Sequence, residues 1–301
     1  MIYNETPLNQ LENKAFGDAG LEILVKCEYL NHPDISGNKW WKLKYNLIKA
    51  KEQGFQKLLT FGGAFSNHIY ATAAAAKENG FESVGIIRGE ETLPLNHVLA
   101  FAESCGMKLH YVSREKYRRK NDPSFIEYLK EKFENFYLIP EGGSNVLAVK
   151  GCAEWAQKLA EEISFDYVCL PVGTGGTMAG IISGLQGEKE IIGFPVLKGA
   201  EFLENDIQKL VCEFSGKGFS SWQLNHDYHF GGYAKSTPDL LKFIDQFKMD
   251  FNIPLERIYT GKMMYGVFDL AMKGFFKKGS TVLVLHTGGL TAFPNQQPVA
   301  N

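Results

Sequence analysis

The sequence predicts an α/β protein with two lobes and doubly wound, mostly parallel sheets. Short apolar runs typical of buried strands alternate with longer runs of helical period along most of the chain, and glycines separate many of them. A strand, a helix and a second strand in succession favour a right-handed crossover and a parallel sheet. The chain has 301 residues, which is enough for two domains of ordinary size or one large α/β unit.

Composition and charge argue against several classes of protein. The formal net charge is −2, so the chain lacks the electrostatic character of a protein that binds nucleic acid or an anionic membrane. No apolar run approaches the ~18 residues of a membrane span, and the N-terminus lacks the pattern of a signal peptide. The five cysteines are scattered and form no metal-binding pattern, which indicates free thiols. We therefore expect a cytoplasmic protein with no nucleic-acid, membrane or metal partner.

The first half of the chain shows the alternation clearly. A strand over residues 21–30 leads into the turn Asn31-His-Pro-Asp34. A helix is then predicted from the segment around Lys39 to Gly54, because glycine commonly ends a helix. Further strands are predicted over residues 57–61, 84–87, 109–112 and 136–139, with helices over 71–77, 95–105 and 124–133.

The second half continues the pattern after a predicted domain crossing at Glu141-Gly-Gly-Ser-Asn145. We assign residues 1–45 and 146–301 to a large domain and residues 46–145 to a smaller α/β domain. Residues 214–236 are rich in Gly, Ser, Tyr and His and are predicted to be irregular. Strands are predicted over residues 167–172, 191–194 and 281–285, with helices over 153–163, 178–185, 200–212, 238–249 and 262–273.

The segment Ser36-Gly-Asn-Lys-Trp-Trp-Lys-Leu-Lys-Tyr45 places Lys39 where a turn becomes a helix. The positive end of the helix and the apolar neighbours both disfavour a protonated amine. A neutral lysine amine is the form that Schiff-base chemistry requires. Taken alone, however, the segment favours an ordinary surface lysine, and the case for chemistry depends on the loops that follow.

Gly173-Thr-Gly-Gly-Thr177 lies between a predicted strand and a predicted helix. Backbone amides at such a junction bind anions, and glycines let a phosphate approach closely. The third glycine of the dinucleotide-binding pattern is replaced by Met178, which argues against a nucleotide-binding Rossmann protein. The alternative to phosphate binding is a tight turn that requires small residues.

Two further loops also follow predicted strands. In Gly62-Gly-Ala-Phe-Ser-Asn67, Ser66 could be the N-cap of the next helix, or the loop could hold a substrate carboxylate. Asn67 and His68 could equally face solvent. The last strand opens into His286-Thr-Gly-Gly289, at a sheet edge where α/β proteins bind ligands. A histidine in this position is about as often structural as catalytic.

A candidate Schiff-base lysine, a phosphate loop and a second anion loop together fit pyridoxal 5′-phosphate, PLP, which has one phosphate and one aldehyde. On these residues the sequence resembles the 1-aminocyclopropane-1-carboxylate deaminase/D-cysteine desulfhydrase family, within the tryptophan-synthase-β-like, fold type II PLP enzymes. The resemblance covers nearly the whole chain. Its motifs are Asn31-His-Pro, Ser36-Gly-Asn-Lys39, Gly62-Gly-Ala-Phe-Ser-Asn67, Glu141-Gly-Gly-Ser-Asn145, Gly173-Thr-Gly-Gly-Thr177, Tyr259-Thr-Gly-Lys262 and His286-Thr-Gly-Gly289.

The resemblance implies a role for each matching residue. Lys39 would bind the cofactor aldehyde, and Asn67 would contact the ring hydroxyl. Ser66 would bind the substrate carboxylate and assist proton transfer. Tyr259 would lie over the substrate, with Tyr233 as a second tyrosine of the active site. The phosphate would be held by Gly173, Thr174, Gly175, Gly176 and Thr177.

Two positions bear on the reaction. Cyclopropane deaminases of the family have Glu and Leu where this chain has Thr260 and Thr287, which is similar to the desulfhydrase pattern. A hydroxyl beside the pyridine nitrogen makes a weaker electron sink than a carboxylate does. Expulsion of a thiol needs less of an electron sink than opening of a cyclopropane ring. The resemblance therefore implies D-cysteine conversion to pyruvate, ammonia and sulfide. The alternatives are cyclopropane deaminase, a broader D-amino-acid lyase or dehydratase, and a non-catalytic PLP-binding protein.

The chain departs from the family next to the expected site. Tyr29 stands where an aspartate is common, in Lys26-Cys-Glu-Tyr-Leu30, and Trp41 replaces an arginine. The loss of these charges is expected to affect which small amino acid the enzyme takes. The resemblance also implies a homodimer.

Overall fold

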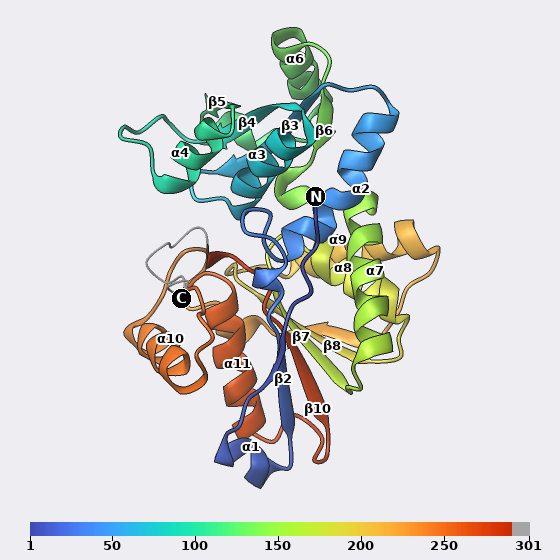
Figure 1. Cartoon of the computed structure of the whole chain (residues 1–301), viewed down its shortest axis with the longest axis vertical. Helices are drawn as coiled ribbons and strands as arrows, with labels where there is room; N and C mark the ends of the chain where they lie inside the picture. The colour runs from blue at the N-terminus through green and yellow to red at the C-terminus, as the bar shows by residue number, and fades with distance from the viewer. Residues whose placement is uncertain (291–301) are drawn as a thin grey trace.

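The computed structural model describes residues 1–290 and contains two sheets, each in its own lobe (Figure 1). The larger sheet has six strands in the order β1-β2-β10-β7-β8-β9, and the smaller has four in the order β5-β4-β3-β6. Within the described residues, adjacent strands are parallel except for β1 and β2. The predicted α/β class with mostly parallel sheets is confirmed. The strands are β1 (Leu8–Gln10), β2 (Glu22–Lys26), β3 (Lys57–Gly63), β4 (Glu82–Arg88), β5 (Met107–Val112), β6 (Tyr137–Ile139), β7 (Tyr167–Val172), β8 (Glu190–Pro195), β9 (Trp222–Leu224) and β10 (Thr281–Leu285).

Helices cover both sheets. Within the part of the chain that the structure describes, none is long and apolar enough to cross a membrane. The helices are α1 (Lys14–Ala19), α2 (Asn38–Glu52), α3 (Asn67–Asn79), α4 (His97–Ser104), α5 (Arg114–Arg118), α6 (Pro123–Phe133), α7 (Val146–Glu162), α8 (Gly176–Leu185), α9 (Phe202–Ser215), α10 (Pro238–Phe251) and α11 (Thr260–Met272).

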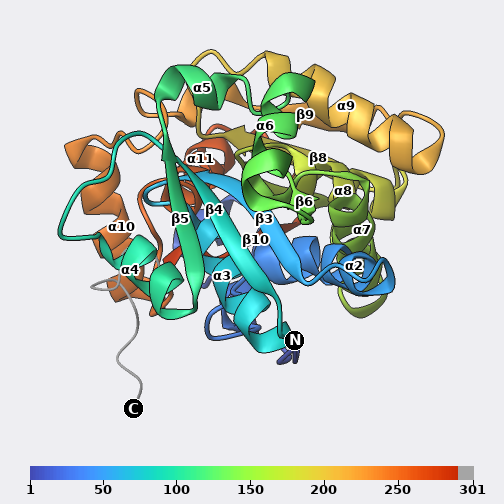
Figure 2. The ribbon, with the colours of Figure 1, turned by 90° about the horizontal axis from the view of Figure 1, so that it is seen from above.

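The large sheet is apolar on both faces because helices cover both. In β10, Leu283 and Leu285 pack with α2, α7, α8 and α9, whereas Val282 and Val284 face α1, α10 and α11. Successive side chains of a strand point to opposite faces, so a strand buried on both sides reads as one apolar run. The small sheet has α3 and α4 on one face and α5 and α6 on the other (Figure 2).

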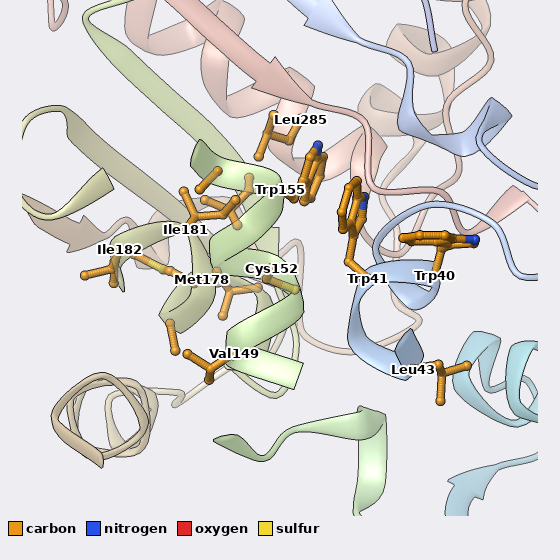
Figure 3. Packing of buried hydrophobic residues seen from close by; sticks show 14 of the residues in the cluster. Trp40, Trp41, Leu43, Val149, Cys152, Trp155, Met178, Ile181, Ile182 and Leu285 are labelled. Carbon is orange, nitrogen blue, oxygen red and sulfur yellow. The ribbon is translucent and has the colours of Figure 1, made fainter. Parts of the chain in front are cut away.

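A cluster of aromatic and small residues fixes α2 against the large lobe. The Trp41 ring of α2 stacks on Trp155 of α7, with ring centroids 6.1 Å apart and planes 7° apart (Figure 3). Gly151 of α7 has no side chain, and a Cβ there would collide with the Trp41 carbonyl. The two helices therefore approach closely. This packing matters for function because Lys39 lies in the first turn of α2.

Several elements differ from the sequence-based prediction. The strand predicted over residues 21–30 ends at Lys26, and a 3-10 helix follows over Glu28–Leu30, where the Glu28 carboxylate turns inward. Residues 214–236 contain the short strand β9, which pairs with β8. β1 and α1 were also missed. The four strands of the small sheet all come from residues 57–139, while the domain limits at 45/46 and 145/146 stay a prediction.

Candidate active site

A cavity of about 280 Å³ lies between the two lobes, where β3, β4, β7 and β10 end. The carboxyl ends of parallel strands are the usual place for ligands in α/β sheets. Sequence-predicted residues from far-apart segments meet here. Those that line the cavity are Lys39, Ser66, Asn67, Gly173, Thr174, Gly175, Gly176, Thr177, Tyr233, Tyr259 and Thr287.

The backbone around Gly37 places Lys39. The Asn31 side chain holds Gly37 from both sides, because its Oδ1 accepts from the Gly37 N–H at 2.8 Å and its Nδ2 donates to the Gly37 carbonyl at 3.0 Å. Gly37 has φ = 68°, and a Cβ there would collide with the Thr287 carbonyl. Only glycine fits a left-handed conformation with so close a contact. Asn38 then donates its N–H to the same carbonyl at 3.2 Å and its side-chain amide to the Thr177 hydroxyl at 2.8 Å.

The two departures from the family lie outside the cavity lining. Trp41 donates its indole N–H to the buried Glu28 carboxylate at 2.6 Å, and Asn31 donates to the same group at 3.0 Å. The indole thus satisfies Glu28 without a charge, and Glu28 in turn orients Asn31. Tyr29 packs against His286, with ring centroids 4.4 Å apart. Our expectation that both departures bear directly on the substrate is not supported by their positions, since neither borders the described cavity.

Lys39 and Lys42 both line this cavity, Lys42 fully buried and Lys39 partly exposed to it. Burial lowers the pKa of Lys39 to about 8, because a desolvated ammonium is disfavoured. Burial and the charge of Lys39 lower the pKa of Lys42 to about 7. Either amine is therefore neutral far more often than a surface lysine at neutral pH, and the pKa values alone do not decide which one reacts.

Their partners distinguish the two lysines. The Lys42 Nζ donates to the Ser144 hydroxyl at 3.0 Å, and Ser144 lies 2.6 Å from the Thr174 hydroxyl of the glycine-rich loop. Lys42 therefore faces the loop predicted to bind phosphate. Within residues 1–290, the Lys39 Nζ forms a hydrogen bond only to the neighbouring Asn38 side chain, at 2.9 Å. Sequence reasoning missed Lys42, although its position three residues after Lys39 places both on one face of a helix.

The start of α8 fits a phosphate group. Its N-cap is Gly175, which has φ = 78° and provides no side chain to accept the first backbone N–H groups of the helix. These groups carry the positive end of the helix dipole. A Cβ on Gly176 would lie 2.6 Å from the Ser144 hydroxyl, so the loop admits no larger residue there. An uncapped helix end with a buried lysine beside it suits a dianion, and Lys39 suits an aldehyde, so the residues present fit PLP.

The second predicted anion loop lies on the opposite wall. The Ser66 Oγ caps α3 by accepting the Ile69 N–H at 3.3 Å, and its hydrogen remains available for a carboxylate. Asn67 begins α3 and lines the cavity. His68 is buried rather than facing solvent, and its Nε2 lies 2.8 Å from the Thr60 hydroxyl. Because Thr60 gives its hydrogen to the Ile139 carbonyl, the His68 ring donates to Thr60 through Nε2.

Two tyrosines close the cavity, and Lys262 ties them together. The rings of Tyr233 and Tyr259 meet edge to face with centroids 6.1 Å apart. Lys262 of α11 is 1% exposed and donates to the carbonyls of His229 and Gly232 at 2.9 and 2.8 Å. It thereby fixes the segment that carries Tyr233 against the helix that follows Tyr259. The lysine of the Tyr259-Thr-Gly-Lys262 motif is thus a positioning residue.

Thr260 is placed differently from our expectation. Its hydroxyl donates to the Glu256 carboxylate at 3.2 Å and accepts the Glu256 N–H at 3.1 Å, and Thr260 is not among the described residues that line the cavity. Glu256 also accepts the backbone N–H groups of Ile258, Tyr259 and Thr260 at 2.6–2.7 Å. Burial raises the pKa of Glu256, but every one of these partners is a donor and favours the carboxylate. This carboxylate caps α11 and was missed by sequence reasoning.

His286 is structural. It is fully buried, and its Nε2 lies 2.7 Å from the Pro254 carbonyl. Burial lowers its pKa to about 4, so the ring is neutral and donates to Pro254. It does not border the described cavity, whereas its neighbours Thr287 and Gly288 do.

Comparisons with known proteins identify the family of the chain. The profile of the family described as "Pyridoxal-phosphate dependent enzyme" matches residues 1–288. The chain belongs to this family. Within it, this PLP-dependent lyase or deaminase is a member of the 1-aminocyclopropane-1-carboxylate deaminase/D-cysteine desulfhydrase group, because relatives with those names are at least 30% identical over most of the chain.

Three of these proteins illustrate the relationship. A protein of Pyrococcus furiosus named "Putative 1-aminocyclopropane-1-carboxylate deaminase" is 32% identical, with 95% of this chain and 90% of the relative covered. The mitochondrial bifunctional D-cysteine desulfhydrase/1-aminocyclopropane-1-carboxylate deaminase of Arabidopsis thaliana is 30% identical, with 90% and 73% covered. The crystal structure of an ACC deaminase homologue, 30% identical, superposes with a TM-score of 0.85 over 97% of this chain and 91% of that one.

Proposed function

We propose that this PLP enzyme eliminates the β-substituent of a small amino acid, with D-cysteine as the substrate and pyruvate, ammonia and sulfide as products. The observation that carries the choice is the absence of a carboxylate at positions 260 and 287, where this chain has threonines. Thr287 lines the cavity, whereas Thr260 lies outside its lining with its hydroxyl bonded to Glu256, so neither position supplies the carboxylate that the resemblance implies for cyclopropane deaminases. The nearby Glu256 carboxylate is already engaged with four donors.

The chain supplies binding, orientation and proton transfer. PLP, when bound, provides the electron sink for a carbanion at the α-carbon. Lys39 would hold the aldehyde and, once released from it, accept the α-proton, for which its lowered pKa suits it. Ser66 at the start of α3 would donate to the substrate carboxylate. Tyr233 and Tyr259 would cover the substrate and restrict water.

The test compares two substrates. We expect kcat/KM for D-cysteine, measured as sulfide and pyruvate release, to exceed that for 1-aminocyclopropane-1-carboxylate by at least about a hundredfold, equal to about 2.7 kcal/mol of transition-state stabilisation. The double variant Thr260→Glu/Thr287→Leu should narrow this ratio by raising activity on the cyclopropane. The single variant Thr281→Leu, at the distant start of β10, is the control and should leave the ratio unchanged.

Cyclopropane deaminase activity is the second candidate, because relatives at 30–32% identity carry that name. A higher kcat/KM for the cyclopropane than for either enantiomer of cysteine would establish it and overturn our choice. Turnover of several D-amino acids at similar rates would instead indicate a broader lyase.

The proposal also covers the domains and the oligomeric state. We propose that residues 46–145 form the smaller domain of each subunit. We also propose that two subunits form a homodimer. Light scattering coupled to size-exclusion chromatography should give about twice the chain mass of 33.7 kDa, and a mass near that of one chain would contradict the dimer.

A further inference from the structure

Arg88 is a charged residue of the cavity that the proposed reaction does not use. It ends β4 beside Gly63 of β3, which is its register partner in the parallel sheet. A Cβ on Gly63 would lie 3.5 Å from an Nη of Arg88. The guanidinium therefore extends across the strand that leads directly into the Ser66–Asn67 loop, and both strand ends border the cavity.

The guanidinium is held from one side by an aromatic ring. Its central carbon lies 5.6 Å from the centre of the Tyr117 ring, within the range of a cation–π contact. The Tyr117 hydroxyl donates to Glu141 at 2.7 Å, which fixes that ring. The Tyr117 ring thus restricts the orientation of the Arg88 guanidinium, although the Arg88 side chain is exposed at the cavity.

The anionic side chains at the cavity are already engaged elsewhere. Glu141 accepts from Tyr117 and pairs with Lys120 at 3.3 Å, and Asp34 lies 3.4 Å from the Tyr70 hydroxyl. Within residues 1–290, Arg88 forms no ion pair or hydrogen bond. Its positive charge is therefore available to a ligand.

The other cations of the cavity have distinct assignments. Lys42 faces the phosphate loop, and Lys39 would hold the aldehyde. A substrate carboxylate bound at the start of α3 uses Ser66. A free guanidinium next to that loop can bind a second anion, because its planar donors match the oxygens of a carboxylate, sulfonate or phosphate group.

We propose that Arg88 selects amino acids whose β-substituent carries a negative charge. This inference rests on the proposed function, since it assigns Arg88 to the β-substituent of the same substrate, which in D-cysteine carries a negative charge as the thiolate. It predicts that a β-substituted amino acid with an anionic group binds more tightly than a neutral one of equal size.

Aspartate and asparagine provide the matched pair of probes, because they differ by a carboxylate and an amide. Each is used as a competitive inhibitor of pyruvate release from β-chloro-D-alanine by the holoenzyme, in both enantiomers. We expect the inhibition constant of the better aspartate enantiomer to be at least about tenfold lower than that of the matching asparagine, as one charge-assisted contact would give.

Arg88→Met should reduce this ratio to less than about threefold, and Arg88→Lys should keep part of it because the charge remains. Arg114→Met, at an exposed arginine that starts α5, is the control and should keep the full ratio. Circular dichroism checks that each variant is folded.

Three results would overturn the inference. The wild type could show no preference for aspartate, or Arg88→Met could keep the wild-type preference. Arg88→Met could also weaken both inhibitors equally, which would place Arg88 at the α-carboxylate.

Failure of the proposed function can be distinguished from failure of this inference. If β-chloro-D-alanine is not turned over by holoenzyme with its cofactor bound, the proposed reaction fails. Calorimetric titration with the same two amino acids then gives the Arg88 ratio without turnover.

Discussion

Replacement of Lys39 by alanine should abolish turnover, with a loss of at least about a thousandfold in kcat for pyruvate release. The reason is that Lys39 carries both of its proposed roles on one amine: it holds the aldehyde, and it moves the α-proton. The methyl group of alanine can do neither. The neighbouring Lys42 cannot replace it without leaving Ser144 and the phosphate loop. The measurement is single-turnover kinetics together with the visible absorbance of the bound cofactor.

The control is Lys49→Ala, which removes an exposed lysine from the same helix. It should leave both the absorbance and the rate unchanged. Retention of the absorbance band and of more than a tenth of wild-type turnover in Lys39→Ala would show that a different amine carries the cofactor.

The second large effect is expected from Lys42→Met, which should weaken PLP binding about 10- to 150-fold. A hydrogen bond to a charged group contributes about 1.5–3 kcal/mol, and about 1.4 kcal/mol corresponds to a tenfold change in affinity. Methionine has nearly the length of lysine and removes only the amine. Since Lys42 is 2% exposed and its amine is partly neutral without the cofactor, the fold should tolerate the change.

The dissociation constant can be measured by titrating apo-protein with PLP and following quenching of tryptophan fluorescence. Lys49→Met is the matched control and should bind as the wild type does. A Lys42→Met variant with unchanged affinity would contradict the assignment of Lys42 to the phosphate. A variant that binds PLP weakly but keeps wild-type kcat at saturating PLP would support it, because it separates cofactor binding from chemistry.

Much of this fold could be predicted from the sequence because its signals are local. The alternation of apolar and amphipathic runs gave the strands of both sheets to within a few residues, apart from the three-residue edge strands β1 and β9. β1 reads Leu-Asn-Gln and β9 reads Trp-Gln-Leu, so neither forms an apolar run, whereas the equally short β6 lies in the apolar run of residues 136–139. The glycine-rich loop before α8 was also found, and its N-cap Gly175 has φ = 78°, a left-handed conformation that favours glycine.

The missed residues depend on tertiary contacts. Lys262 donates to backbone carbonyls 30 or more residues away. Glu256 accepts nearby backbone N–H groups, but through a turn whose direction the sequence does not show. The same applies to Thr260, whose hydroxyl turns toward Glu256 rather than into the cavity. Trp41 was read as a lost charge, but the fold uses its indole N–H to satisfy Glu28. Such roles follow from where a side chain points, which periodicity and motif spacing do not determine.

The most direct test of the account is to find which lysine carries the cofactor. Borohydride reduction of the PLP-loaded protein would fix the cofactor to the amine that holds it, and peptide mass spectrometry after chymotryptic digestion would locate the added group. Our account predicts modification of Lys39 alone, even though burial lowers the pKa of Lys42 further. Modification of Lys42 instead, or no modification of either lysine, would contradict the division of roles on which the active site is built.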